Sequence, residues 1–239
     1  MGTPTRYPNG VSTAKREWPL GQYGLPNPMA WHTYFEDFDT YVAGDWTITR
    51  VGTTPTEALT DVDGGALLLT LSAADNDSDY LQKKGESFLP TSGKKLIFAA
   101  RFKVSDATQS DLVMGLQVTD TTPMAAAGDG VTDGIFFQKD DGDANIDFYV
   151  QKDATTGQLT TTAATTIATD TFVELAFYFD GARYVTVFKD KAPVSVVDLT
   201  TTLTTYLPDT ELTISFGVQN GEAVAKTMTI DYIFAAQER

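Results

Sequence analysis

Hydrophobic and polar residues alternate most clearly over residues 172–197. A large apolar side chain stands at every second position of the first run: Val173, Leu175, Phe177 and Phe179. One face of this extended segment is therefore apolar. The run ends at Asp180-Gly181, where glycine can adopt the positive φ of a tight turn. Two shorter apolar runs follow, at 184–188 and 194–197. The pattern predicts an antiparallel meander of three strands with one buried face.

Similar runs along the chain predict further strands, at 46–51, 64–72, 80–82, 96–104, 112–118, 135–138, 146–151, 212–218 and 227–237. The sequence DDGDAN, around Gly142, is a hairpin signal. In the last run, the residues expected to share one face are Met228, Ile230, Tyr232 and Phe234. Two threonine-rich stretches, 155–166 and 198–208, are expected to be exposed strands or loops. No segment combines a helical period with caps over three turns. The chain is therefore predicted to be all-β, with two antiparallel sheets packed face to face in a jelly-roll sandwich.

Residues 1–31 differ from the rest because prolines and glycines interrupt any helix or strand. This segment nevertheless contains four large aromatic residues: Tyr7, Trp18, Tyr23 and Trp31. A free linker seldom exposes such residues to solvent. We therefore expect an extended N-terminal arm over 1–31 and one β-sandwich domain over 32–239. The arm either packs on its own domain, lies on a neighbouring subunit through the four aromatic residues, or is disordered.

Composition limits the classes of partner. The 239 residues are 42% hydrophobic, enough for a substantial core, and carry a formal net charge of -15. Non-specific binding to nucleic acid or to an anionic membrane needs positive charge, so neither partner is expected. The absence of cysteine excludes disulfides, cysteine nucleophiles and thiolate metal sites. Neither a signal peptide nor a membrane span is recognisable, so we expect synthesis in a cytoplasm.

Few residues offer catalytic chemistry. The single histidine, His32, would have to serve any Ser-His-Asp triad, and no G-x-S-x-G elbow is present. We interpret it as a packing or hydrogen-bonding residue. Glycosidases need two carboxylates about 5–10 Å apart. The nearest approach, Glu36-Asp37-Phe38-Asp39, has the wrong spacing for one strand face, and it is assigned to the first strand. We therefore do not expect an enzyme.

One loop is a candidate calcium site. Asp75, Asp77 and Asp79 have the one-three-five spacing of a calcium loop, and Glu86 falls at position twelve. Tyr80 stands where such a loop needs glycine, which favours solvated turns instead. A second acidic turn at 140–143 has oxygen ligands but no further ligand pattern. No metal or other cofactor is assigned, and calcium stays an open alternative.

Three aromatic residues of the meander, Tyr178, Tyr184 and Phe188, are expected on its outer face. There they could stack on a sugar or on a protein, or belong to a second packed layer. The sequence does not separate these alternatives.

Three stretches resemble the first, middle and last strands of concanavalin-like jelly rolls, a group that includes laminin-G modules: TYFEDFDTYVAGDW, FVELAFYFDGARYVTVFKDKAPV and TMTIDYIFAAQ. This resemblance covers roughly residues 33–237 and implies the fold but not the function, because the same sandwich serves lectins, glycosidases and viral coat components. The first forty residues, with TRYPNGVSTA and GQYGLPNPMAWHTYFEDFDTY, resemble the start of virion structural proteins of tailed bacteriophages. There an extended arm precedes a jelly-roll body that decorates or cements the capsid.

The phage resemblance implies a capsid decoration or cement protein located on the capsid surface of the virion. Such a protein would bind the major capsid protein and form a homo-oligomer, with a trimer as one option. The alternative is a carbohydrate-binding, lectin-like module of a phage fibre or a secreted bacterial protein. A glycosidase or lyase is the third reading, and no carboxylate is nominated for it.

Overall fold

The computed structural model describes residues 28–52, 55–124, 130–154, 157–199 and 203–239. These residues form fifteen strands, a 3-10 turn (η3) and one short helix (α1). The strands are β1 Trp31–Glu36, β2 Trp46–Val51, β3 Thr56–Leu59, β4 Leu67–Thr70, β5 Ser78–Lys83, β6 Leu96–Val104, β7 Ser110–Gln117, β8 Gly134–Lys139, β9 Asn145–Lys152, β10 Gly157–Thr166, β11 Val173–Phe179, β12 Tyr184–Lys189, β13 Ala192–Asp198, β14 Thr213–Asn220 and β15 Thr227–Glu238. The turn η3 is Ala43–Asp45, and the helix α1 is Leu203–Tyr206.

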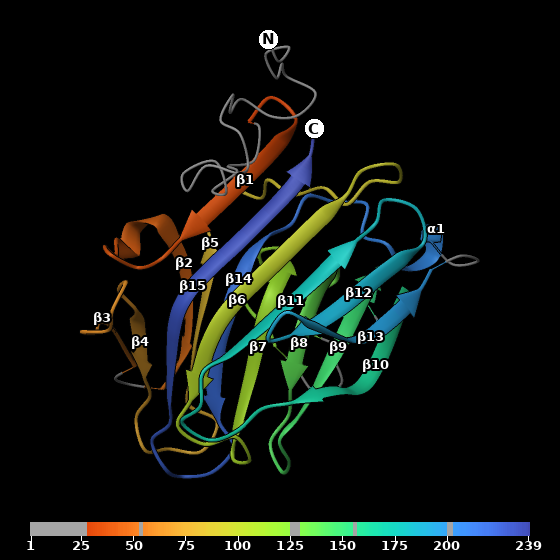
Figure 1. Ribbon diagram of the computed structural model, residues 1–239. Helices are drawn as coiled ribbons and strands as arrows, with labels where there is room; N and C mark the ends of the chain where they lie inside the picture. Colours follow the sequence, from red (N-terminus) through yellow and green to blue (C-terminus); the bar gives the residue numbers. More distant parts are fainter. Residues whose placement is uncertain (1–27, 53–54, 125–129, 155–156, 200–202) are drawn as a thin grey trace.

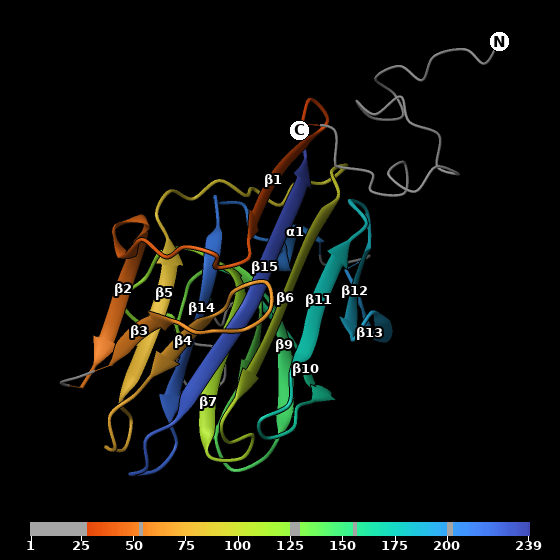
Figure 2. The same ribbon diagram turned by 60° about the vertical axis from the view of Figure 1, so that its left-hand side comes forward.

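The strands form two antiparallel sheets, A and B, which pack face to face. Sheet A lies in front of sheet B in Figure 1. Sheet A has eight strands in the order β13-β12-β11-β6-β15-β4-β3, with β1 paired to β15. Sheet B has seven, in the order β10-β9-β8-β7-β14-β5-β2. The predicted all-β sandwich is confirmed. Figure 2 shows β1, β15, β6 and β11 side by side along sheet A.

The meander of β11, β12 and β13 forms as predicted. Its first turn contains Gly181 at φ 84°. The Oδ1 atom of Asp180 accepts hydrogen bonds from the backbone N–H groups of Ala182, Arg183 and Tyr184, at 2.8, 2.7 and 3.0 Å. One carboxylate oxygen thus satisfies three donors that the turn leaves without ladder partners.

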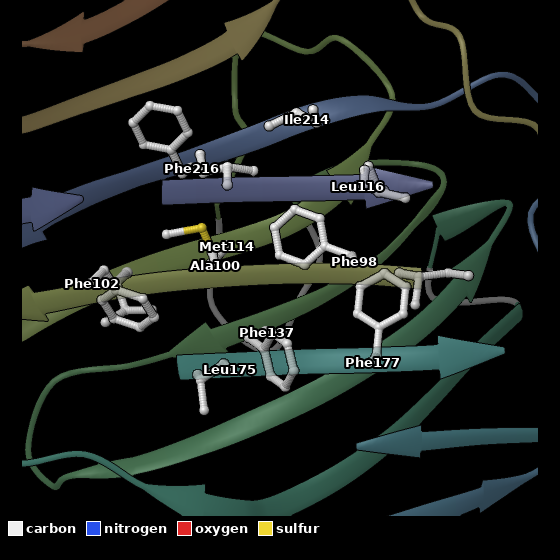
Figure 3. Close-up of a cluster of buried hydrophobic side chains, with 14 of the residues drawn as sticks. Phe98, Ala100, Phe102, Met114, Leu116, Phe137, Leu175, Phe177, Ile214 and Phe216 are labelled. Atoms are coloured by element: carbon white, nitrogen blue, oxygen red, sulfur yellow. The ribbon is translucent and has the colours of Figure 1, made fainter. Parts of the chain in front are cut away.

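Aromatic side chains fill the space between the sheets. Phe177 of β11 stacks on Phe98 of β6, with ring centroids 5.4 Å apart, and approaches Phe148 of sheet B at 5.6 Å. Figure 3 shows Phe98, Phe137 and Phe177 gathered in one buried cluster. Along β6, buried and half-buried residues alternate from end to end. All eight residues of β7 are buried, including those on its outer face.

The predicted face of the last strand is wrong beyond Ile230. A β-bulge lies between Ile230 and Tyr232 in the pairing with β6. The extra residue reverses the alternation. Met228 and Ile230 therefore lie in the core, whereas Tyr232 and Phe234 lie on the outer face of sheet A.

The threonine-rich stretches have different structures. The described part of 155–166 is strand β10, one of the two predicted forms. The described part of 198–208 contains helix α1, which was not predicted. The short strand β3 was also missed, because its four residues show no alternation.

The last residue of the predicted arm lies in a strand. Trp31 was assigned to the arm, but it is the first residue of β1, opposite Glu238 of β15. The residues before β1 are held by Arg239: its backbone N–H donates to the carbonyl of Ala30, and its Nε donates to the carbonyl of Pro28, each at 2.9 Å.

Within the described ranges, no helix has the length and apolar character needed to cross a bilayer.

Candidate functional site

The predicted partner-binding residues of the arm are only partly visible. Tyr7, Trp18 and Tyr23 lie outside the described residues. Trp31 is half-buried at the start of β1. The contribution of these four residues to partner binding stays a prediction.

The candidate calcium ligands do not converge. Asp75 and Asp77 precede β5, Asp79 lies within it, and Glu86 follows its other end. An extended strand of six residues spans about 20 Å, so the loop that would bring position twelve back to position one does not form. Glu86 instead accepts a hydrogen bond from the backbone N–H of Thr119, at 2.6 Å. Among the described residues, no group of three or more His, Asp or Glu is arranged to hold a metal ion.

Asp79 belongs to an ion cluster between the sheets instead. Its Oδ1 accepts a hydrogen bond from Nε of Arg50 at 3.1 Å, and Arg50 also pairs with Glu57 of sheet A. Burial, together with the hydrogen bond and charge of Glu57, raises the pKa of Asp79 to about 7. Burial and the same two carboxylates raise the pKa of the nearby Tyr41 to about 12. The cluster fastens the edge of sheet B to the edge of sheet A.

His32 packs as predicted. Its Nε2 lies 3.2 Å from the hydroxyl of Ser87, and its ring lies 4.9 Å from that of Phe88. Burial and the charge of Arg239 lower its pKa. In the described structure no carboxylate hydrogen-bonds this ring, so the Ser-His pair lacks the third member of a triad.

The acidic stretch 36–39 leaves the first strand after Glu36. β1 ends at Glu36, and Phe38 then adopts φ 54° and enters the core. The Oε1 of Glu36 accepts the backbone N–H of Phe38 at 3.1 Å. The assignment of this stretch to the first strand is wrong beyond its first residue, because the strand ends at Glu36 and Phe38 turns into the core.

The three meander aromatics do lie on the outer face of sheet A. Tyr178 pairs with Thr186, and Phe188 pairs with Ala176, in alternation with the core residues. Tyr184 is 36% exposed, and the other two are half-buried. Their role is untested by this placement.

The outer face of sheet B was not identified from the sequence as a possible binding surface. One half of this face is a small apolar cluster beneath the β7–β8 connection: Tyr80, Val113, Val131, Phe136 and Tyr149. The rings of Phe136 and Tyr149 stack at 5.2 Å. A Cβ at Gly217 would lie 2.4 Å from the ring of Tyr80, and a Cβ at Gly115 2.6 Å from Cβ of Phe136. The glycines thus let these aromatic rings lie directly on the sheet.

Two glutamine amides attach the connection to the sheet over this half. Gln117 donates to the carbonyl of Pro123 at 3.0 Å, and Gln82 donates to that of Val118 at 2.9 Å. The apolar half is therefore covered by the chain itself.

The other half is polar and is more open. Its members, which we call the polar cluster, are Asn76, Asp111, Gln138, Asp140, Asp147 and Gln219. Tyr80 joins the two halves, because its hydroxyl donates to Oε1 of Gln219 at 2.8 Å. Strand pairing places Asp111 opposite Gln219 and Gln138 opposite Asp147. Asp140, Asp147 and Gln219 are exposed or half-buried, so the polar cluster can be reached from solvent.

Asp111 is the unusual member of the polar cluster. It is 7% exposed, and its Oδ1 has no hydrogen-bond partner. Burial, with the charge of Asp141, raises its pKa to about 6. A buried oxygen without a partner costs free energy, and a ligand hydroxyl that donates to it would remove that cost.

A cavity of about 260 Å³ adjoins the polar cluster. Its lining is Asp140, Asp141, Asp143, Asn145, Asp147, Thr162 and Ala163. Asp143 is occupied within its own turn, accepting from the backbone and side chain of Asn145 at 2.7 Å each. Asp147 accepts the backbone N–H of Ala163 at 2.7 Å. The second acidic turn of the sequence therefore forms one wall of a polar depression.

The signal for the polar cluster is present in the sequence but scattered. Asp111 and Gln219 flank apolar runs, and Gln138 and Asp147 stand between core residues. Their meeting depends on β7, β8, β9 and β14 being neighbours. Pairing of strands about a hundred residues apart is not visible in local alternation.

Comparisons with known proteins support the fold. No family model matches the chain, and no curated protein matches it. Among solved structures, an endo-1,3-β-glucanase from Streptomyces sioyaensis aligns with a TM-score of 0.61 and 12% identity, over 90% of this chain and 99% of that one. Peanut lectin aligns with a TM-score of 0.56 and 12% identity, over 87% and 97%. An endo-β-1,4-glucuronan lyase from the fungus Trichoderma reesei aligns with 0.57 and 11%, over 85% and 94%.

These identities are low enough that the likeness shows the fold alone. The chain is a concanavalin-like, two-sheet β-sandwich, a fold that these structures share across lectins, glycosidases and a lyase.

Proposed function

We propose that this protein is a carbohydrate-binding, lectin-like module whose binding surface is the polar cluster on the outer face of sheet B. The observation that carries the proposal is the buried, unpartnered Oδ1 of Asp111 beside the amide of Gln219. Sugar hydroxyls both donate and accept hydrogen bonds, and a carboxylate next to an amide offers both functions. The fold is shared with peanut lectin, which supports this class of ligand.

The ligand is a neutral glycan. The chain carries a formal net charge of -15, and the depression beside the polar cluster is lined by carboxylates. An anionic sugar would be repelled there. Hydroxyl groups of a neutral sugar meet no such penalty.

Binding without bond cleavage is part of the proposal. A glycosidase needs two carboxylates that face each other across the substrate. In the described structure, the outward positions of β5, β7, β8 and β14 carry one carboxylate, Asp111. The other acids of the polar cluster lie at the β8–β9 turn and on β9.

A glycan array with the wild-type protein and an Asp111→Asn variant tests the proposal. We expect binding to one class of neutral glycan, at least tenfold weaker in Asp111→Asn, a loss of about 1.4 kcal/mol. Thr186→Ala, on the outer face of sheet A, is the control and should bind as the wild type does. No signal above background, or binding insensitive to Asp111→Asn, would contradict the proposal.

The capsid decoration role stays a prediction from the sequence. The three similar structures are a lectin, a glucanase and a lyase, and none of them supports it. Its specific test is co-sedimentation of the purified protein with expanded phage capsids. A protein that never sediments with capsids would remove this reading.

A further inference from the structure

The outer face of sheet A carries an apolar stripe whose two ends are exposed and whose middle is partly or fully buried. Neighbouring strands place one residue each in a row across β1, β15, β6, β11 and β12: Phe35, Phe234, Ala99, Ala176 and Phe188. Val196 of β13 lies on the same face in the next row, opposite Thr186. We call these six residues the apolar stripe. Phe35 is 60% exposed and Val196 58% exposed. Contiguous apolar surface of this kind marks an interaction site, whereas scattered apolar residues do not.

The middle of the apolar stripe carries small side chains. Ala99 and Ala176 stand opposite each other on β6 and β11, between the phenylalanines of β15 and β12. Two residues further along the same strands, Ile97 and Tyr178 are paired on this face and are half-buried. Small residues at the centre leave room there for side chains of a facing sheet.

The size of the face fits a stable protein interface. The six strands that adjoin here are spaced by about 4.8 Å, so the face is about 24 Å wide. The strands are about 20–30 Å long, which gives on the order of 500–700 Å². A standard interface buries about 800 Å² on each partner.

Ion pairs border the apolar stripe on both sides. Lys95 pairs with Glu238 at 3.5 Å and Arg183 with Asp198 at 2.7 Å on one side, and Arg101 pairs with Asp231 on the other. The face is therefore close to neutral locally, although the whole chain carries a net charge of -15. An apolar centre with a polar rim is the usual anatomy of an interface.

Local neutrality favours a second copy as the partner. Two copies of this acidic chain repel each other over most approaches, and this face avoids that repulsion. Edge-to-edge pairing through β13 is disfavoured, because Pro193 and the bulge between Val187 and Phe188 interrupt its ladder.

We propose that the outer face of sheet A packs against the same face of a second copy across a two-fold axis, with the apolar stripe at the centre. An interface between identical patches closes on itself and gives a dimer, not a trimer. The homo-oligomer expected from the sequence would then be a back-to-back dimer. Its outer faces of sheet B point away from each other, so both glycan sites stay accessible and could bind together. The dimer does not depend on the glycan proposal.

Sedimentation equilibrium from 1 to 100 µM tests the proposal. We expect a dimer for the wild type, and at least tenfold weaker association for Val196→Lys and for Phe35→Lys, because two-fold symmetry introduces each charge twice. Val224→Lys is the matched control, since Val224 is 50% exposed in the β14–β15 connection, off the stripe. It should dimerise as the wild type does. Far-UV circular dichroism and melting curves establish that the variants are folded.

Cross-linking adds a test of geometry. The chain has no cysteine, so a single Ala99→Cys variant has no background. A short bis-maleimide should join two copies through position 99, at the centre of the stripe, and should not join copies of Val224→Cys. A monomeric wild type at 100 µM, or a dimer unaffected by both lysine variants, overturns the proposal. If the wild type is monomeric and Phe35→Lys abolishes glycan binding, this face binds a ligand and not a second copy. That result would also overturn the proposal.

Discussion

Arg50 of sheet B and Glu57 of sheet A form an ion pair that joins the edges of the two sheets. Arg50 also binds Asp79, its partner on the neighbouring strand β5. The side chains of Asp79 and Glu57 are 0% and 8% exposed, and that of Arg50 is 39% exposed. One partly exposed cation therefore pairs with two buried carboxyl groups, of which Asp79 has a raised pKa.

Replacing Arg50 with Met should destabilise the protein by about 2 kcal/mol. Removal of one partner from a buried ion pair costs about 3–5 kcal/mol, and the partial exposure of Arg50 lowers that value. Urea unfolding measures the change. Arg183→Met is the control, because Arg183 and Asp198 are both nearly half-exposed, and it should destabilise the protein far less than Arg50→Met does. Equal losses in the two variants would show that the inter-sheet cluster is no stronger than a surface pair.

The raised pKa of Asp79 predicts that acid stabilises the fold over part of the pH range. The folded-state pKa is about 7, against an ordinary value of 3.8. Between these values the folded protein holds a proton that the unfolded chain has lost, so the free energy of unfolding falls as pH rises from about 4 to about 7. Asp111, at about 6, acts in the same direction.

Urea midpoints at pH 5 and pH 8 measure this effect. We expect the wild type to be more stable at pH 5 and Asp79→Asn to show a smaller difference, because asparagine does not titrate. An unchanged difference in Asp79→Asn would assign the dependence to another group.

Gly217→Ala should destabilise the fold by about 1–3 kcal/mol, the usual cost of overpacking. The new Cβ would lie 2.4 Å from the carbonyl oxygen of Asp79 and from the ring of Tyr80. Gly44→Ala is the control, since its nearest neighbour lies 3.9 Å away. Melting temperatures of the two variants give the comparison. A Gly217→Ala protein as stable as Gly44→Ala would mean that the Tyr80 ring moves freely.

Asp180→Ala should cost about 1–2 kcal/mol, because three backbone donors of the β11–β12 turn lose their acceptor. Asp180→Asn retains an oxygen in the same place and should recover most of the loss. Chemical denaturation of the three proteins gives the comparison. If Asn and Ala lose equally, the negative charge of Asp180 matters more than the acceptor.

The sequence by itself determined the elements with one buried face. Val173 to Phe179 and Leu96 to Val104 alternate strictly, and alternation specifies both the strand and its inward side. The turn at Asp180-Gly181 and the two-sheet sandwich follow from the same local signals. His32 was correctly interpreted as a packing residue, because one histidine without a recognisable nucleophile motif offers little else.

Only the tertiary structure decided which residues meet across strands. The bulge after Ile230 moved Tyr232 and Phe234 to the outer face, and no local signal marks a bulge of this kind. Asp79 was a candidate calcium ligand in the sequence, but strand pairing places it opposite Arg50. Asp111 and Gln219 are more than a hundred residues apart, and the apolar stripe draws on six strands. Alternation fixes the side of a strand on which a residue lies, whereas long-range pairing fixes its neighbours, and the proposed sites consist of neighbours.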